Sequence, residues 1–204
     1  MRREKFGHHT GRNFYAELYF NGKKKEAAYV IRGTDSNGDF GDYLADLQIG
    51  LGQVPHQFAE AERNYQTVKR LAGERFLGDY KLYLTGHSLG GGLASMLSAK
   101  QGGVPTVTFN APGMMFSYIR SHTIPLIGLY KFSKLDSSRM LHMRATGDPV
   151  SMATGKHMGR VEDVYVDEWG DNKIVGASRH VAQHSIDNMV KTLAKYSQYH
   201  KELA

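Results

Sequence analysis

The chain of 204 residues is long enough for one domain with a sizeable core and too short for two domains of ordinary size. Hydrophobic residues make up 41% and charged residues 23%, as in a globular protein, and no apolar run of about 18 residues predicts a membrane-spanning helix. The absence of cysteine excludes disulfides, zinc–thiolate sites and a cysteine nucleophile.

The formal net charge is +6, and the basic residues are mostly scattered along the sequence. This charge is either a solubilising surface or a means of approaching an anionic membrane surface, and no nucleic-acid partner is expected. The basic start, Met1 to Lys5, continues into Gly7-His8-His9-Thr10 without an apolar segment, so it is not a secretory signal. We therefore expect either a cytoplasmic protein or one exported by a non-classical route, which leaves the compartment open.

The first half of the chain predicts a hairpin followed by a helix. Residues 14–20 and 26–32 are rich in aromatic and β-branched types and flank Asn21-Gly22, which predicts two antiparallel strands. Residues 27–31 are nearly all apolar, which predicts burial on both faces. Pro55 then opens a helix whose apolar residues recur at spacings of three and four: Phe58, Ala61, Tyr65, Val68 and Leu71.

The second half predicts strands that alternate with helices. Expected strands lie at residues 81–85, 105–110, 140–145, 161–168 and 173–175. A tight turn is expected at 86–92, a helix at 93–100, and a last helix near Val181 with one apolar face: Ile186, Met189, Val190, Leu193 and Tyr196. This alternation predicts an α/β domain with a mainly parallel sheet. Residues 114–139 lack a clear period, and we interpret them as a cap-like or lid-like excursion above the sheet.

The pentapeptide Gly86-His87-Ser88-Leu89-Gly90 follows an apolar strand and precedes a helix rich in Ala, Leu and Met. A serine hydroxyl attacks an acyl group only when it is exposed at a turn and a base removes its proton. A strand–turn–helix elbow presents Ser88 in this way, and glycines on either side let the strand and helix approach each other closely. We predict that Ser88 is a nucleophile and that the backbone N–H of Leu89, at the helix start, is an oxyanion donor.

These segments together resemble the class 3 lipase family of triacylglycerol lipases and phospholipases. The similarity runs from about Thr10 to Tyr196 and includes residues 29–34, 42–47, 84–91, 107–113, 147–150 and 183–185 in the family's order. It implies an α/β-hydrolase fold with helices on both faces of the sheet, carboxylic ester hydrolysis without a cofactor, and a Ser-Asp-His triad. It also implies that Thr34 gives the second oxyanion contact. Family members usually carry helices before the first strands, so we expect one domain over residues 1–204 that lacks N-terminal helices.

Asp148 and His184 are the predicted acid and base of this triad. Asp148 follows a strand and is held between Gly147 and Pro149, at the strand end where α/β folds place functional residues. His184 is preferred to His180, one helical turn away, because His-Ser ahead of an amphipathic helix matches the family. The other candidates are expected to be structural or exposed: His8, His9, His87, His142, His157, Asp163 and Asp167. In particular, His87 is expected to pack with its side chain directed away from the site.

The acidic residues Asp35, Asp39, Asp42 and Asp46 lack the spacing of a calcium loop, so no metal is expected. Residues 40–51 are where the family often has its lid. The sequence therefore predicts a lipase or phospholipase A-type acyl hydrolase that acts on a lipid or other acyl ester. Two alternatives stay open: an esterase or thioesterase for small soluble substrates, and a catalytically silent binding module.

Overall fold

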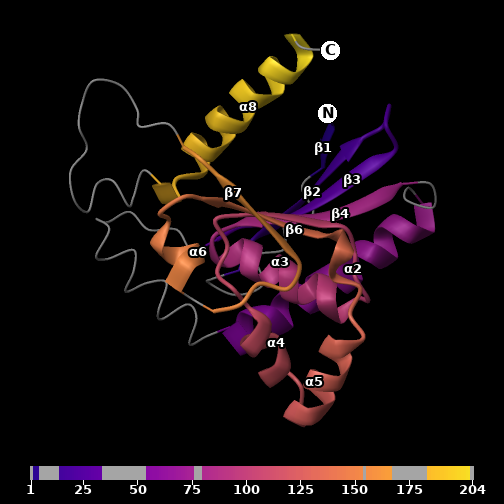
Figure 1. Ribbon diagram of the computed structural model, residues 1–204. Coiled ribbons are helices and arrows are strands. Elements are labelled where there is room, and N and C mark those ends of the chain that lie inside the picture. The colour runs from indigo at the N-terminus through magenta and orange to yellow at the C-terminus, as the bar shows by residue number, and fades with distance from the viewer. Residues whose placement is uncertain are drawn as a thin grey trace.

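The computed structural model describes residues 2–4, 14–33, 54–75, 80–153, 155–166 and 183–202. Its centre is a seven-stranded sheet in which the strands follow their order in the chain (Figure 1). Strands β1 (Arg2–Glu4), β2 (Ala16–Asn21) and β3 (Glu26–Ile31) are antiparallel neighbours. Strands β4 (Lys81–His87), β5 (Thr106–Phe109), β6 (Met140–Ala145) and β7 (Arg160–Val164) continue the sheet from β3 in parallel. The predicted hairpin and the mainly parallel sheet are thus confirmed, and β1 is an additional edge strand.

Helices cover both faces of the sheet, as predicted. Helices α2 (Val54–Arg75), α3 (Leu89–Lys100), α4 (Met115–Arg120) and α5 (Pro125–Ser133) lie on one side, and α8 (Ile186–Glu202) lies on the other (Figure 1). A 3₁₀ turn (Ser137–Arg139) precedes β6, and a short helix, α6 (Pro149–Ala153), follows β6. Among the described residues, no helix is long and apolar enough to cross a membrane.

Because side chains alternate along each strand, they contribute to two separate hydrophobic cores, one on each face of the sheet. The larger core includes Leu84 of β4, Met140 of β6 and nearly all of α3, which is buried from Leu89 to Ala99. The smaller core joins Ala145 and Val164 to Met189 of α8. The strand β3 was expected to be buried on both faces, but only alternate residues are buried, because α2 and α3 cover one face of it.

Two further expectations need correction. Helix α3 begins at Leu89 and not at residue 93, so the glycines 90–92 belong to its first turn. The last helix presents Met189 to the core, but Val190 is 56% exposed, since adjacent residues on a helix point about 100° apart. The expected strand at residues 173–175 and the expected lid at 40–51 lie outside the described residues.

The segment 114–139 has a definite structure although its sequence shows no clear period. It contains α4, α5 and the 3₁₀ turn, and it connects the carboxyl end of β5 with the amino end of β6. Gly128 lets the two helices touch, because a Cβ atom there would lie 2.4 Å from the carbonyl oxygen of Ile119.

Candidate active site

Ser88 lies at the sharp turn between β4 and α3. Its backbone has φ 54° and ψ −133°, a conformation that is strained for any residue with a Cβ atom. Two backbone hydrogen bonds hold it there: Ser88 N–H donates to the Phe109 carbonyl at 3.0 Å, and Gly92 N–H donates to the Ser88 carbonyl at 3.1 Å. The strand–turn–helix setting predicted for this pentapeptide is therefore present, but Ser88, which was expected to be exposed at the turn, is only 2% exposed.

Close backbone contacts explain why glycines surround the turn. A Cβ atom on Gly86 would lie 2.5 Å from the carbonyl carbon of Gly90, and one on Gly90 would lie 2.3 Å from the Ile31 carbonyl oxygen. Both neighbours are backbone atoms, which cannot rotate away as a side chain can. The start of α3 consequently packs directly against β3 and β4.

This close packing also brings the end of β3 to Ser88. A Cβ atom on Gly33 would lie 3.3 Å from the Cβ atom of Ser88 and 2.7 Å from the His87 carbonyl oxygen. Thr34, the residue predicted to give one oxyanion contact, follows Gly33 and lies outside the described residues. Leu89 is the first residue of α3, where backbone N–H groups have no partner within the helix.

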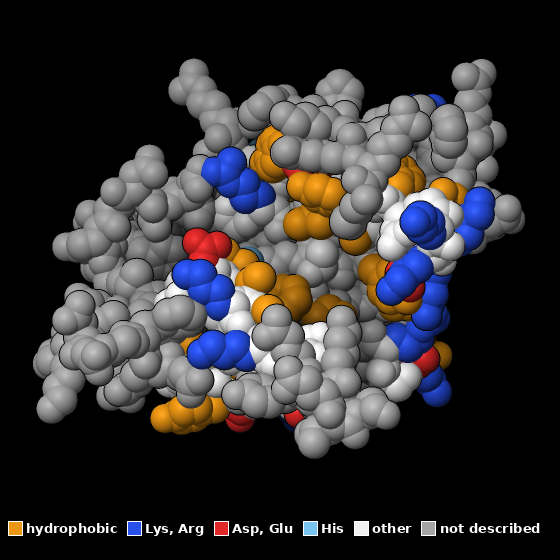
Figure 2. Space-filling model, turned by 90° about the horizontal axis from the view of Figure 1, so that it is seen from above, with side chains coloured by type: hydrophobic (Ala, Val, Ile, Leu, Met, Phe, Trp, Pro, Cys, Tyr) orange, Lys and Arg blue, Asp and Glu red, His pale blue; other side chains and the backbone are white. Residues whose placement is uncertain are grey.

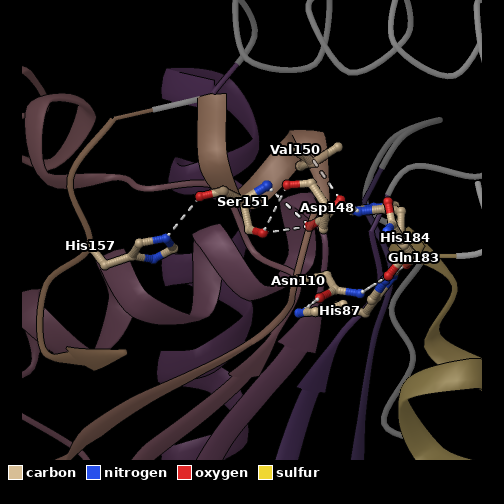
Figure 3. Close-up of polar contacts among 9 residues, drawn as sticks. His87, Asn110, Asp148, Val150, Ser151, His157, Gln183 and His184 are labelled. Atoms are coloured by element: carbon tan, nitrogen blue, oxygen red, sulfur yellow. Dashed lines mark hydrogen bonds and ion pairs between the residues drawn. The ribbon is translucent and has the colours of Figure 1, made fainter. Parts of the chain in front are cut away.

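Asp148 is fully buried and accepts four hydrogen bonds at the carboxyl end of β6 (Figure 3). Its Oδ1 accepts from Val150 N–H at 3.2 Å and from His184 Nδ1–H at 2.7 Å. Its Oδ2 accepts from the N–H and the hydroxyl of Ser151 at 3.1 and 2.6 Å. Burial alone would raise the pKa of Asp148, but the bonds from His184 and Ser151 outweigh it, so its pKa lies below the ordinary value. The carboxyl group is therefore ionised.

His184 lies in the turn before α8, with its side chain 6% exposed. Because the Asp148 carboxylate is an acceptor, the Nδ1 atom that faces it carries a hydrogen, which makes Nε2 the basic nitrogen when the ring holds one proton. The structure thus brings two of the predicted triad residues into direct contact. Ser88 directly follows His87, whose ring centroid lies 4.7 Å from that of His184.

Two side chains that sequence reasoning did not assign to the site hold the backbone of His184 (Figure 3). His87 Nε2 lies 2.6 Å from the His184 carbonyl oxygen, and Asn110 Nδ2 donates to that oxygen at 3.2 Å and to the Gln183 carbonyl at 3.0 Å. Burial, and next the nearby His184, lower the pKa of His87 to about 4, so His87 is a neutral ring that donates from Nε2. His87 was expected only to pack away from the site, and this expectation was wrong.

Asn110 also fixes the ends of the neighbouring strands. Its Oδ1 accepts from Ala145 N–H at 2.8 Å, and its own N–H donates to the Met143 carbonyl at 2.9 Å. It is fully buried and has φ 47°, a left-handed conformation that asparagine tolerates better than most residues. In the sequence, Asn110 is the last residue of the expected strand at 105–110 and precedes Ala-Pro-Gly, a pattern that marks the end of a strand but does not predict this contact.

A chain of polar contacts leads away from Asp148 on its other side. The Ser151 carbonyl lies 3.2 Å from His157 Nε2, and the His157 ring lies 4.8 Å from that of His142. His142 is buried between the Thr108 hydroxyl at 2.7 Å and the Met158 carbonyl at 3.0 Å. His142 and His157 are therefore structural contacts in this fold, as expected.

The remaining candidate that the structure describes is Asp163, which forms an ion pair with Arg144 at 2.6 Å and is largely exposed. The other candidates considered above lie outside the described residues: His8, His9, Asp167, His180, Asp35, Asp39, Asp42 and Asp46. The described residues contain no group of three or more side chains that could hold a metal ion.

Comparison with known proteins gives the family of the chain. A family model described as a Tle-like phospholipase domain matches residues 2–194. The chain belongs to this phospholipase-like family. It is 24% identical over 92% of its length to an extracellular phospholipase A1 of Serratia liquefaciens, and it spans 58% of that protein. It is 45% identical over 37% of its length to an ATG15 lipase of Eremothecium gossypii, of which it spans 13%. The chain thus spans less than two thirds of these relatives.

Solved structures show the fold independently. A mutant form of MDLA from Penicillium cyclopium superposes with a TM-score of 0.50 and 12% identity, covering 90% of this chain and 75% of that one. A fungal lipase structure superposes with a TM-score of 0.51 and 15% identity, covering 85% and 66% of the two chains. The predicted lipase-like α/β-hydrolase fold is confirmed.

Proposed function

We propose that this chain is a serine carboxylic ester hydrolase of the lipase or phospholipase A type, with Ser88, His184 and Asp148 as its triad. The observation that carries the proposal is the buried hydrogen bond of 2.7 Å between His184 and Asp148, beside a strained serine at a strand–helix turn. Membership of the phospholipase-like family and the similarity to a phospholipase A1 support lipid esters as the substrate class.

In the proposed reaction, Ser88 Oγ attacks the ester carbonyl carbon while His184 Nε2 takes the hydroxyl proton. The buried Asp148 carboxylate holds the imidazole in the required tautomer and stabilises its positive charge. Backbone N–H groups of Leu89 and Thr34 bind the oxyanion of the tetrahedral intermediate. The alcohol then leaves with the proton from His184, and a water activated by His184 releases the acid from acyl-Ser88.

The lipid substrate suggests a peripheral contact with an anionic membrane surface, which the net charge of +6 favours. Figure 2 shows one face of the molecule, on which the Lys and Arg side chains of the described residues lie mainly at the two sides of the view, several of them close together along the right side. Positive charge alone does not mark a membrane-docking surface, so a specific one should combine it with exposed apolar side chains.

A fluorophosphonate probe tests the nucleophile. We expect it to label Ser88 in the wild-type chain and in Ser95→Ala, which removes the next serine on α3, and to leave Ser88→Ala unlabelled. Fatty-acid release from phospholipid vesicles and hydrolysis of a soluble short-chain ester then distinguish the substrate classes. Activity on the short ester with no rise when substrate forms micelles would indicate a soluble esterase. A folded wild-type chain without labelling or hydrolysis would contradict the proposal and favour a binding module.

A further inference from the structure

Helix α5 and the residue before it expose an unusual amount of apolar surface. Five large side chains in this stretch, called the α5 patch below, are exposed by 45% to 73%: Ile124, Leu126, Ile127, Leu129 and Tyr130. Within α5 only Gly128 is buried, at the contact with α4. Single exposed apolar residues are ordinary, but four on one short helix and a fifth directly before it form a patch of the kind that marks an interaction surface.

The charged side chains within the segment that carries the α5 patch are all positive, and the next acidic residue along the chain is Asp136. No Asp or Glu occurs between Gln101 and Leu135, whereas Arg120, Lys131 and Lys134 lie in or beside the two helices. All three of these basic residues are exposed. An apolar helix bordered by Lys and Arg is complementary to an interface that is apolar inside and negatively charged at its surface.

The placement of the patch connects it to the candidate active site. In Figure 1, α4 lies between α5 and α6, the helix that directly follows Asp148. Met115 N–H at the start of α4 donates to the Lys156 carbonyl at 3.1 Å, which ties α4 to the segment after α6. Two further exposed apolar side chains lie along this path, Phe116 on α4 at 62% and Met152 on α6 at 58%.

We propose that the α5 patch, with Phe116 and the three basic residues, is a docking surface that inserts into the headgroup region of an anionic phospholipid membrane. The proposal deepens the proposed lipid-ester hydrolase function and rests on it for its biological purpose. Apolar side chains enter the boundary between headgroups and acyl chains, and Lys131, Lys134 and Arg120 contact lipid phosphates. The exposed path along α4 and α6 places the Asp148 side of the molecule near the same surface.

Vesicle sedimentation tests the docking surface apart from catalysis. The Ser88→Ala chain is mixed with vesicles of phosphatidylcholine alone or with added phosphatidylglycerol, so that no lipid is hydrolysed during binding. Leu126→Gln/Leu129→Gln is compared with Val190→Gln, which removes an equally exposed apolar side chain from α8 (56% exposed). Lys131→Gln/Lys134→Gln tests the contribution of charge. Circular dichroism melts show whether each variant folds, and hydrolysis of a soluble ester is measured in the same variants with Ser88 intact.

We expect preferential binding to the anionic vesicles, reduced at least about tenfold by the double leucine change and about fivefold for each lysine removed. Val190→Gln should bind like the parent chain, and all the variants should keep their activity on the soluble ester. The docking proposal would be overturned if the leucine variant bound vesicles as well as the parent chain does, or if the parent chain bound neither kind of vesicle. In either case, activity on the soluble ester would still support the proposed function. Self-association that depends on Leu126 and Leu129, without vesicle binding, would likewise overturn it and assign the patch to a second copy of the chain.

Discussion

Among single residues, Asn110 makes hydrogen bonds to several of the segments that form the site. Its side chain joins the end of β6 to the turn that contains His184, and its backbone has φ 47°. Replacing Asn110 with alanine or glycine removes the same buried hydrogen bonds. Only alanine adds the strain of a positive φ, because glycine adopts positive φ freely, so the two variants separate backbone strain from the loss of hydrogen bonds.

We predict that Asn110→Ala lowers the free energy of unfolding by about 3 kcal/mol, and that Asn110→Gly is about 1 kcal/mol less damaging. Elsewhere in a folded chain alanine is usually the more stabilising of the two. Urea denaturation of both variants measures the difference. If Asn110→Ala proves the more stable variant, the left-handed backbone of Asn110 carries no cost and the argument fails.

Ser151 is a positioning residue for the proposed acid. Its hydroxyl donates to Asp148 Oδ2 at 2.6 Å and helps to keep the pKa of that carboxyl group low. We predict that Ser151→Ala lowers kcat/KM about tenfold and moves the acid limb of its pH profile to higher pH, because the ionised carboxylate loses a donor. Ser151→Thr should restore both. The measurement is kcat/KM on a soluble ester between pH 4 and 9.

A matched control exists on the surface of the same protein. Ser138 Oγ donates to Asp136 Oδ1 at 2.6 Å, an equally short contact between an exposed pair. Ser138→Ala should change neither kcat/KM nor the pH profile. A uniform loss of activity in Ser151→Ala, with the acid limb unmoved, would mean that Ser151 supports only the fold.

Between elements, the contact of α3 with β3 and β4 decides whether the serine turn forms. We predict that Gly90→Ala destabilises the protein by more than about 3 kcal/mol, because its Cβ atom would lie 2.3 Å from the Ile31 carbonyl oxygen. In Gly22→Ala, the added Cβ atom would meet only the Tyr80 hydroxyl at 3.6 Å, an ordinary contact. Thermal unfolding should therefore show a large drop in Tm for the first variant and little change for the second. Similar Tm values would show that α3 can move away from β3 at low cost.

The same elements show what local sequence patterns can and cannot predict. Periodicity placed α2 correctly, because this helix has one face on the core. Residue types and the Asn21-Gly22 turn placed the hairpin correctly, and the bounds expected for β6 are those observed. The local pattern placed the start of α3 four residues late, since a run of glycines reads as a turn until the close contacts with β3 and β4 are known. It also predicted no helices in α4 and α5, because a helix that exposes apolar side chains has no polar face to give it a period.

For the molecule as a whole, the site residues also divide into those that local sequence patterns predict and those that depend on distant contacts. Ser88 and Asp148 could be predicted as candidates because each stands at a strand end with glycine or proline beside it. The roles of His87 and Asn110 could not, since both depend on contact with residues far along the chain, in the turn before α8. Such contacts follow from the order of strands in the sheet, which brings the ends of β4, β5 and β6 together at one edge.

Burial of neutral histidines should make the stability of the whole molecule depend on pH. His142 is 2% exposed, and burial lowers its pKa to about 4 from the usual 6.5. Its ring lies 4.8 Å from that of His157, which also lowers the pKa of His142. Because the unfolded chain binds a proton at higher pH than the folded chain does, the stability that neutral His142 contributes is fully present above pH 6.5 and is lost as pH falls towards 4.

We predict that His142→Gln, which keeps a donor for the Met158 carbonyl but cannot titrate, flattens this dependence by up to about 3 kcal/mol between pH 7 and pH 4. His87, with a pKa of about 4 for the same reason, should leave part of the slope in place. The measurement is the free energy of unfolding in urea across that range. His56→Gln serves as the control, because the His56 side chain is 76% exposed and should leave the slope unchanged. If the free energy of unfolding of His142→Gln depended on pH as steeply as that of the wild type, burial of neutral His142 would not be the cause of the dependence.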